Sequence, residues 1–241
     1  MTSQPPIETR ARLSRERVLR TAVALADREG LESLSMRKLA DELGSGAMSL
    51  YHYVPNKEQL LDGIVDIVFS EIEPPSTDVD WKTAMRKRAI STREALRRHP
   101  WAIGLMEGRT NHGPANLRLH DAVLGCLRAA GFSLEMTVHA YAVQDAYIYG
   151  FALQEKNIPF ESAEEGAAVA EEQVREFAEL ADERQMGALA DEFPYLAEVV
   201  AGHVAEVGYD FAAAFEYGLD LILDALEKRR EPEAPRTTAA S

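Results

Sequence analysis

The stretch from Met36 to Leu61 constrains the fold of this chain more than any other. Its first apolar residues recur at i, i+3, i+4 and i+7, the spacing of one helical face: Met36, Leu39, Ala40 and Leu43. Ser35 precedes this helix as a candidate N-cap, and Gly44 follows it where a helix can end in the left-handed conformation. A second helix, over about 47–53, ends before Pro55. Two short helices joined by a glycine turn predict a helix-turn-helix, whose second helix usually enters the DNA major groove.

The segments around this stretch complete a small N-terminal domain. One helix, over about 14–28, precedes it, and another, over about 57–71, follows. We therefore expect a disordered arm at 1–9, a helix-turn-helix domain at 10–56 and a connecting segment at 57–73.

The rest of the chain is predicted to be helical as well. Apolar periodicity and capping residues indicate further helices at about 81–98, 101–106, 115–130, 134–156, 162–184, beyond Pro194 and at 211–228. Since no strand or repeat is evident, the predicted fold class is all-α. The helical body spans 80–228, and a loose tail follows at 229–241.

Charge is distributed unevenly along the chain. The net charge is −14, yet residues 1–60 hold nine basic and eight acidic side chains, so the acidic excess lies in the remainder. Five arginines gather near the amino terminus: Arg10, Arg12, Arg15, Arg17 and Arg20. This distribution lets the N-terminal domain approach phosphate while the acidic body points away. The alternative is that these arginines form only a solvated helix face.

Several classes of protein are disfavoured by what the sequence lacks. It has no apolar run of the roughly 18 residues that a membrane span needs, and its amino terminus lacks the pattern of a signal peptide. The single Cys126 cannot form an intrachain disulfide. We therefore expect a cytoplasmic protein with no membrane partner. No glycine-rich phosphate loop, paired-cysteine motif or nucleophile–base pair is present, so no cofactor, metal or enzymatic activity is expected.

The segment LSMRKLADELGSGAMSLYHYVPNKEQLLD resembles the DNA-binding domain of the tetracycline-repressor (TetR) family. The resemblance is carried by Arg37–Ala40, Leu43–Gly44, Ser49–Tyr51, Asn56–Lys57 and Leu60–Leu61. It implies that Arg37 reaches bases or phosphate, and an arginine can donate two hydrogen bonds to guanine. It also places the leading end of the second helix against base edges: Ser45, Gly46, Ala47, Met48 and Ser49. Because these residues are small and weakly polar, readout through thymine methyl groups or DNA shape is expected.

Three further residues are expected to contact the DNA backbone. Tyr51 matches a family tyrosine and Tyr53 lies near it, so both phenols are candidates for phosphate contacts. Lys57 opens the next helix, where its ammonium and the backbone N–H groups suit a phosphate. Alternatives remain: Arg37 can be merely solvated, and the tyrosines can pack against the first helix, which fits Tyr53 better than Tyr51.

The body resembles the tetracycline-repressor branch at Gly131–Glu155 and Phe215–Arg229. In that family these two helices pair with their copies as a four-helix dimer bundle, which implies a homodimer on a palindromic operator. Small and apolar residues on the last helix fit such a bundle: Ala212, Ala213, Ala214, Phe215, Gly218, Leu219, Ile222 and Leu226. The alternative is that they form an ordinary core within one chain.

The same resemblance bears on the effector. The branch's ligand-contacting His, Asn and Phe fall at Glu73, Arg88 and Thr92, and none is retained. A magnesium chelate needs its ligands at set positions, so tetracycline is not expected to bind. The expected pocket lies between the 81–98, 115–130 and 134–156 helices, with mostly apolar walls that suit a flat aromatic or drug-sized molecule: Thr92, Met106, Leu119, Val123, Tyr141 and a buried Asp145. For Val123 and Tyr141 the alternative is plain core.

Two functions follow. The first is a dimeric, sequence-specific transcription regulator, usually a repressor in this family, that a small effector releases from its operator. The second is a non-inducible DNA-binding protein whose body serves only dimerisation or partner binding. A large apolar cavity in the body favours the first function, and a filled body favours the second.

Overall fold

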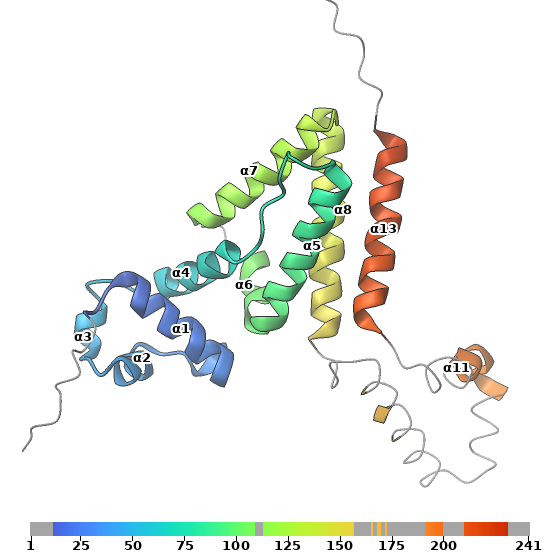
Figure 1. Cartoon of the computed structure of the whole chain (residues 1–241). Coiled ribbons are helices and arrows are strands. Elements are labelled where there is room, and N and C mark those ends of the chain that lie inside the picture. The colour runs from blue at the N-terminus through green and yellow to red at the C-terminus, as the bar shows by residue number, and fades with distance from the viewer. Residues whose placement is uncertain are drawn as a thin grey trace, which may run out of the picture. The chain divides into compact units, whose positions relative to one another are not determined.

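The computed structural model describes residues 12–108, 113–156, 165, 168–169, 172, 191–199 and 210–230. Every regular element in these ranges is a helix, which confirms the all-α fold class (Figure 1). None of the described helices is long and apolar enough to cross a membrane. The chain forms two compact units, Met1–Tyr141 together with the last residues, and Ala142–Arg230. The expected arm at 1–9, the tail beyond Arg230 and all but four residues of the expected helix at 162–184 lie outside the described residues.

Three helices and one helical turn form the N-terminal part of the first unit, which we call the head (residues 15–54). They are α1 (Arg15–Glu29), the 3-10 turn η1 (Leu31–Ser33), α2 (Met36–Leu43) and α3 (Ala47–Leu50). The Ser35 hydroxyl accepts the Lys38 N–H at 3.2 Å, and Gly44 ends α2 in the left-handed conformation at φ 61°. The helix-turn-helix and both of its predicted caps are therefore confirmed.

The second helix of this motif is shorter than predicted. It ends at Leu50, and the expected helical residues up to Tyr53 form a turn in which the Tyr53 and Val54 N–H groups both donate to the Leu50 carbonyl. Val54 precedes Pro55 and is pushed out of the helical region, so the chain unwinds before reaching it.

The core of the head is built mainly from α1. This helix packs against α2, η1 and the following helix, and its buried side chains are Val18, Leu19, Ala22, Val23, Leu25 and Ala26. Leu50 is the apolar anchor of α3 and is fully buried. The next helix, α4 (Lys57–Ser70), begins at Asn56, whose side chain accepts the Gln59 N–H at 2.8 Å. A Cβ at Gly63 would lie 2.6 Å from the Leu19 side chain, so this glycine lets α4 approach α1 closely.

The first unit continues with α5 (Trp81–Arg98), the 3-10 turn η2 (Pro100–Ala102), α6 (Ile103–Gly108), α7 (Pro114–Ala129) and the start of α8 (Leu134–Glu155). Figure 1 shows α4 leading from the head to this body. Buried aromatic side chains link its elements, as where Trp81 meets Phe132 edge to face at 4.9 Å between ring centroids. The body helices agree with the sequence prediction to within two residues at each described end.

The second unit contains the rest of α8, α11 (Pro194–Val199) and α13 (Phe211–Arg229). The Tyr147 hydroxyl of α8 donates to the Phe215 carbonyl of α13 at 2.9 Å, and a side chain at Gly218 would overlap the Tyr147 ring. Phe215, Leu219 and Leu226 are buried within the chain itself. For these three residues the structure supports the alternative, a core within one chain, and the rings of Tyr147 and Phe151 on α8 pack against Phe215.

Candidate nucleic-acid interface

The predicted recognition helix α3 divides its side chains sharply between core and solvent. Leu50 is fully buried, whereas Met48 is 79% exposed and Tyr51, at the end of the helix, is 42% exposed. Gly46 and Ser49 are exposed on the same short segment. Most of the leading end of α3 is thus available to base edges while one leucine holds the helix in place.

Three of the predicted DNA-contacting residues are only half exposed. They are Ser45, Ala47 and Tyr53. The Ser45 hydroxyl oxygen is buried and has no hydrogen-bond partner among the described residues. A contact between this hydroxyl and a base requires the side chain to turn outward. The DNA contact of Ser45 therefore remains a prediction that needs this rotation.

The two predicted cationic contacts flank α3 on neighbouring helices. Arg37 lies in the first turn of α2 and Lys57 in the first turn of α4, and both are exposed. The N-terminus of α4 carries partial positive charge from its backbone N–H groups, which would reinforce the phosphate contact predicted for Lys57. The structure therefore presents a guanidinium and an ammonium on the elements next to the recognition helix.

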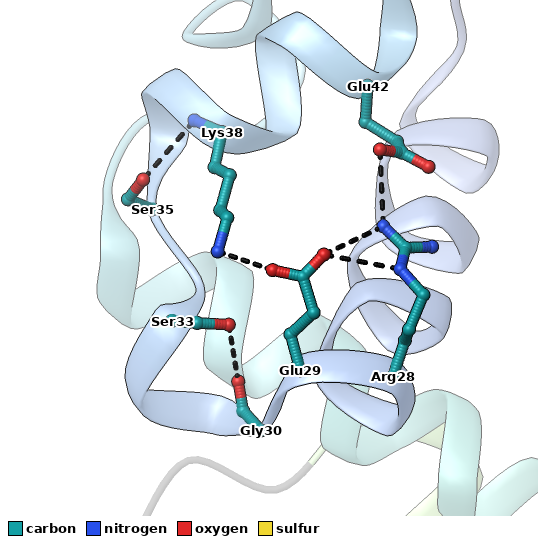
Figure 2. Close-up of polar contacts among 7 residues, drawn as sticks. All are labelled: Arg28, Glu29, Gly30, Ser33, Ser35, Lys38 and Glu42. Atoms are coloured by element: carbon teal, nitrogen blue, oxygen red, sulfur yellow. Dashed lines mark hydrogen bonds and ion pairs between the residues drawn. The ribbon is translucent and has the colours of Figure 1, made fainter.

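An ion-pair network fixes α2 against the end of α1, and the sequence analysis did not anticipate it. Arg28 contacts Glu29 at 3.0 Å and Glu42 at 3.2 Å, and Lys38 contacts the other oxygen of Glu29 (Figure 2). Hydrogen bonds from Lys38 and Arg28 lower the pKa of Glu29, and the hydrogen bond to Glu29 raises the pKa of Arg28. Exposed pairs of this kind add little stability. They join the end of α1 to the first and last turns of α2, the helix that carries Arg37.

The arginines at the start of α1 remain open to both predicted interpretations. Arg12 and Arg15 are exposed, while Arg20 pairs with Glu16 at 2.9 Å one helical turn away. Arg17 and Arg20 also line a groove of about 580 Å³ between α1 and α2, whose walls include Glu16 and Glu42. The acidic side chains there make this groove a poor phosphate site. Arg10 lies outside the described residues.

The residues predicted for the effector pocket are not all in the same environment. Thr92, Leu119 and Val123 are buried on α5 and α7, whereas Met106 and Tyr141 are half-buried. The Thr92 hydroxyl donates to the carbonyl one turn earlier on α5 at 2.8 Å.

Asp145 departs from its prediction. It is half exposed and lies in the second unit, so the expectation that it is buried is wrong for the single chain. Its helix, α8, lacks a clear division into polar and apolar faces, so periodicity placed its side chain poorly.

Two models of known families match this chain. The model of bacterial regulatory proteins of the tetR family matches residues 18–64, and the tetracycline-repressor-like C-terminal domain matches residues 73–230. The second match alone covers more than half of the chain, and residues 65–72, which include the end of α4, separate it from the first. The chain belongs to the tetR family.

Individual relatives agree with this assignment. The transcriptional repressor DrrR1 of Streptomyces coeruleorubidus is 41% identical over 142 residues, which are 58% of this chain and 53% of that protein. The chain thus matches about half the length of DrrR1. The class C tetracycline repressor protein of Escherichia coli is 31% identical over 222 residues, 91% of this chain and 93% of that protein.

A solved structure supports the same family. The tetR-family protein ActR of Streptomyces coelicolor, in complex with actinorhodin, has a TM-score of 0.70 at 25% identity, over 92% of this chain and 100% of that one. The chain therefore combines a tetR-family helix-turn-helix head with a tetracycline-repressor-like C-terminal domain.

Two features of this tetR-family body were missed by the sequence analysis. Arg88 and Arg93 on α5 are buried, at 2% and 8% exposure. A signal was available for Arg88, because it continues the helical stripe of Trp81, Ala84 and Met85.

The other missed feature is a bond between α4 and α7. The Asp66 carboxylate accepts the Ala115 N–H at 2.8 Å and the Asn116 N–H at 3.2 Å. Gly113 precedes α7 without a side-chain cap, so a residue of α4 caps it instead. No signal within either segment could have indicated this, since the two are about fifty positions apart in sequence.

Proposed function

We propose that this protein is a homodimeric repressor that a small aromatic molecule releases from a palindromic operator. The DNA-binding part of this proposal rests on the exposure pattern of α3. The helix buries Leu50, while Met48, Ser49 and Tyr51 are exposed beside Arg37 and Lys57. A single recognition helix this short specifies too few base pairs alone, so two heads are needed, about 34–36 Å apart on successive turns of DNA. Such a repressor acts in the cytoplasm, where its operator lies.

The dimer is supported by an uncovered apolar stripe on α13. Tyr217 and Leu221 are 69% and 56% exposed, and the exposed Ala213 and Ala225 extend the stripe at four-residue intervals. Val143 and Leu153 are exposed on α8, in the same unit. Apolar side chains aligned on one helix face typically mark an interaction surface, and a second copy of these two helices would cover it as a four-helix bundle.

For the effector, we propose a chemical class: a small aromatic molecule other than the tetracycline–magnesium chelate. Glu73, Arg88 and Thr92 replace the side chains that contact ligand in the tetracycline-repressor branch. Thr92 is fully buried and Arg88 nearly so, and a cation at that position does not suit a magnesium chelate. The ActR complex with actinorhodin supports a different small-molecule effector in a related body.

We propose that α4 transmits effector binding from the body to the head. The helix contacts α1 at Gly63, and its Asp66 caps the N-terminus of α7 in the body. A ligand that shifts α7 would therefore pull on α4 and change the spacing of the two heads. A coupling free energy of about 1–3 kcal/mol between the two sites corresponds to a 5- to 150-fold change in operator affinity.

The test begins with operator fragments that the purified protein selects from random DNA duplexes. Fluorescence anisotropy then measures operator affinity with tetracycline plus magnesium, and separately with a panel of aromatic natural products. We expect tetracycline to leave binding intact and another aromatic compound to abolish it. Release by micromolar tetracycline that a chelator reverses would show the effector class to be wrong, and no release by any compound would favour the non-inducible alternative.

A further inference from the structure

His99 ends α5 and lies buried between two acidic side chains from distant parts of the chain. Its Nδ1 lies 2.7 Å from Oδ1 of Asp27 on α1, and its Nε2 lies 3.2 Å from Oε2 of Glu71 at the end of α4. The residue is only 6% exposed. One imidazole ring thus joins the head directly to the first helix of the body, beside the covalent connection through α4.

The hydrogen-bonding chemistry of this cluster specifies the state of the ring that makes both contacts. A neutral imidazole has one N–H and one acceptor nitrogen, whereas an ionised carboxylate only accepts. Both carboxylates already accept from other donors: Trp101 Nε1 donates to Asp27 at 2.6 Å, and Arg98 donates to Glu71 at 2.8 Å. Both ring contacts are therefore hydrogen bonds only when the ring carries two protons.

The charges of the cluster balance in that state. Asp27 faces the ring from α1, Glu71 from the end of α4 and Arg98 from its own helix, while Trp101 of η2 is not titratable. With a doubly protonated ring, two positive and two negative groups meet. Partial burial opposes the charged form of Glu71, but hydrogen bonds from Arg98 and His99 outweigh it and lower the pKa of Glu71. Loss of a ring proton removes one hydrogen bond and leaves an uncompensated negative charge.

We propose that His99 is a positioning residue that fastens α1 of the head to the body, and that operator affinity depends on its charge. The proposal rests on the proposed function, because a dimer fits its operator only when both heads are held at one spacing. Without the second hydrogen bond, α1 is held to the body less firmly. The heads must then be ordered when they bind the operator, which lowers operator affinity. The affinity for random DNA, which is bound through phosphates without a fixed register, is less affected.

The experiment compares the full-length protein with His99→Gln, since glutamine offers one donor nitrogen and one acceptor oxygen and stays neutral. Affinity for the selected operator and for random duplex is measured over a pH series that starts at about pH 6 and continues upward until the ring has lost its second proton. NMR of the ring nitrogens follows the protonation of His99 over the same range. At pH 6 we expect the variant to bind the operator about fivefold or more weakly than wild type. The gap narrows as the ring loses its proton, and random DNA shows little difference.

Control variants distinguish a failure of the His99 proposal from a failure of the proposed function. His139→Gln removes a histidine that is exposed on α8, 3.8 Å from Glu135, and is expected to match wild type. If His99→Gln does not fold, as judged by circular dichroism, Asp27→Asn enters the same comparison because it weakens the other side of the contact. Equal operator affinity of wild type and variant at pH 6, or a gap unchanged by deprotonation of the ring, overturns the proposal. Wild type that does not distinguish operator from random DNA would instead refute the proposed function.

Discussion

The head and the pair formed by α8 and α13 differ in how completely they cover their apolar side chains. In the head, the large apolar residues that remain exposed among those described are Met48 and Tyr51, both at the recognition helix. In the α8–α13 pair, Phe215 is fully buried, but apolar side chains are exposed along both helices: Val143, Leu153, Tyr217 and Leu221.

The difference indicates which region leaves apolar surface that a partner could cover. The head already buries its own core, and its exposed apolar side chains lie where DNA is expected. The α8–α13 pair buries one face in its own chain and leaves another face apolar toward water. Burying that second face against a copy of itself would be favourable by roughly 25 cal/mol per Å² of apolar surface. The head is thus a finished small bundle, whereas the α8–α13 pair keeps an apolar face that a second copy would cover in the proposed dimer.

The largest effect is expected from placing charges on the uncovered apolar face of α13. Tyr217→Asp together with Leu221→Asp is expected to give a monomer in analytical ultracentrifugation at micromolar concentration. Operator affinity should fall about 10²- to 10⁴-fold, because each head then binds without the advantage of its linked partner. The matched control is Val79→Asp, which charges an apolar residue that is 41% exposed in the loop before α5. A double variant that remains dimeric contradicts the assignment of this face.

A second experiment tests whether the head is complete in itself. Leu50→Ala should lower the free energy of unfolding by about 2–5 kcal/mol, since it leaves a cavity under α3. Met48→Ala, two residues earlier but exposed, should change it by no more than about 0.5 kcal/mol. Urea denaturation of both variants measures the contrast, and similar losses at the two positions would show that α3 is not anchored through Leu50.

A third experiment separates the two cations beside α3. Arg37→Ala is expected to cost about 1–3 kcal/mol at one operator base pair and to relax the preference there. Lys57→Ala should weaken binding to all sequences alike and reduce the salt slope by about one unit. Affinities for the operator, its single-base variants and random duplex distinguish the two. Equal losses on operator and random DNA for Arg37→Ala argue against base readout by Arg37.

The smallest expected effect concerns how the head is attached to the body, and it appears in acid. Because the pKa of Glu71 is lowered from its ordinary 4.5 in the folded state, its contribution is present above that pH and is lost as the pH falls through the lowered value. Wild type should therefore lose more stability than Glu71→Gln between about pH 5 and 3. With a third of the Glu71 side chain exposed, the difference should stay within about 1 kcal/mol. Parallel acid denaturation curves would contradict it.

The sequence predicted best those features that depend on neighbours within one or two helical turns. The caps at Ser35, Gly44 and Asn56 and the anchor Leu50 were all found in place. Each follows from local backbone chemistry and from apolar periodicity. Where several neighbours were apolar at once, as around Phe215 on α13, periodicity identified a packing face but not which chain covers it.

By itself, the sequence determined an all-helical chain with a helix-turn-helix near its amino terminus, because caps, turns and helical stripes are local. Only the tertiary structure decided which face of α13 is buried in its own chain, that Asp66 caps α7, and that His99 lies between Asp27 and Glu71. These contacts join residues that are tens of positions apart in sequence. Their partners are chosen by how whole helices pack, and no periodicity within one segment carries that information.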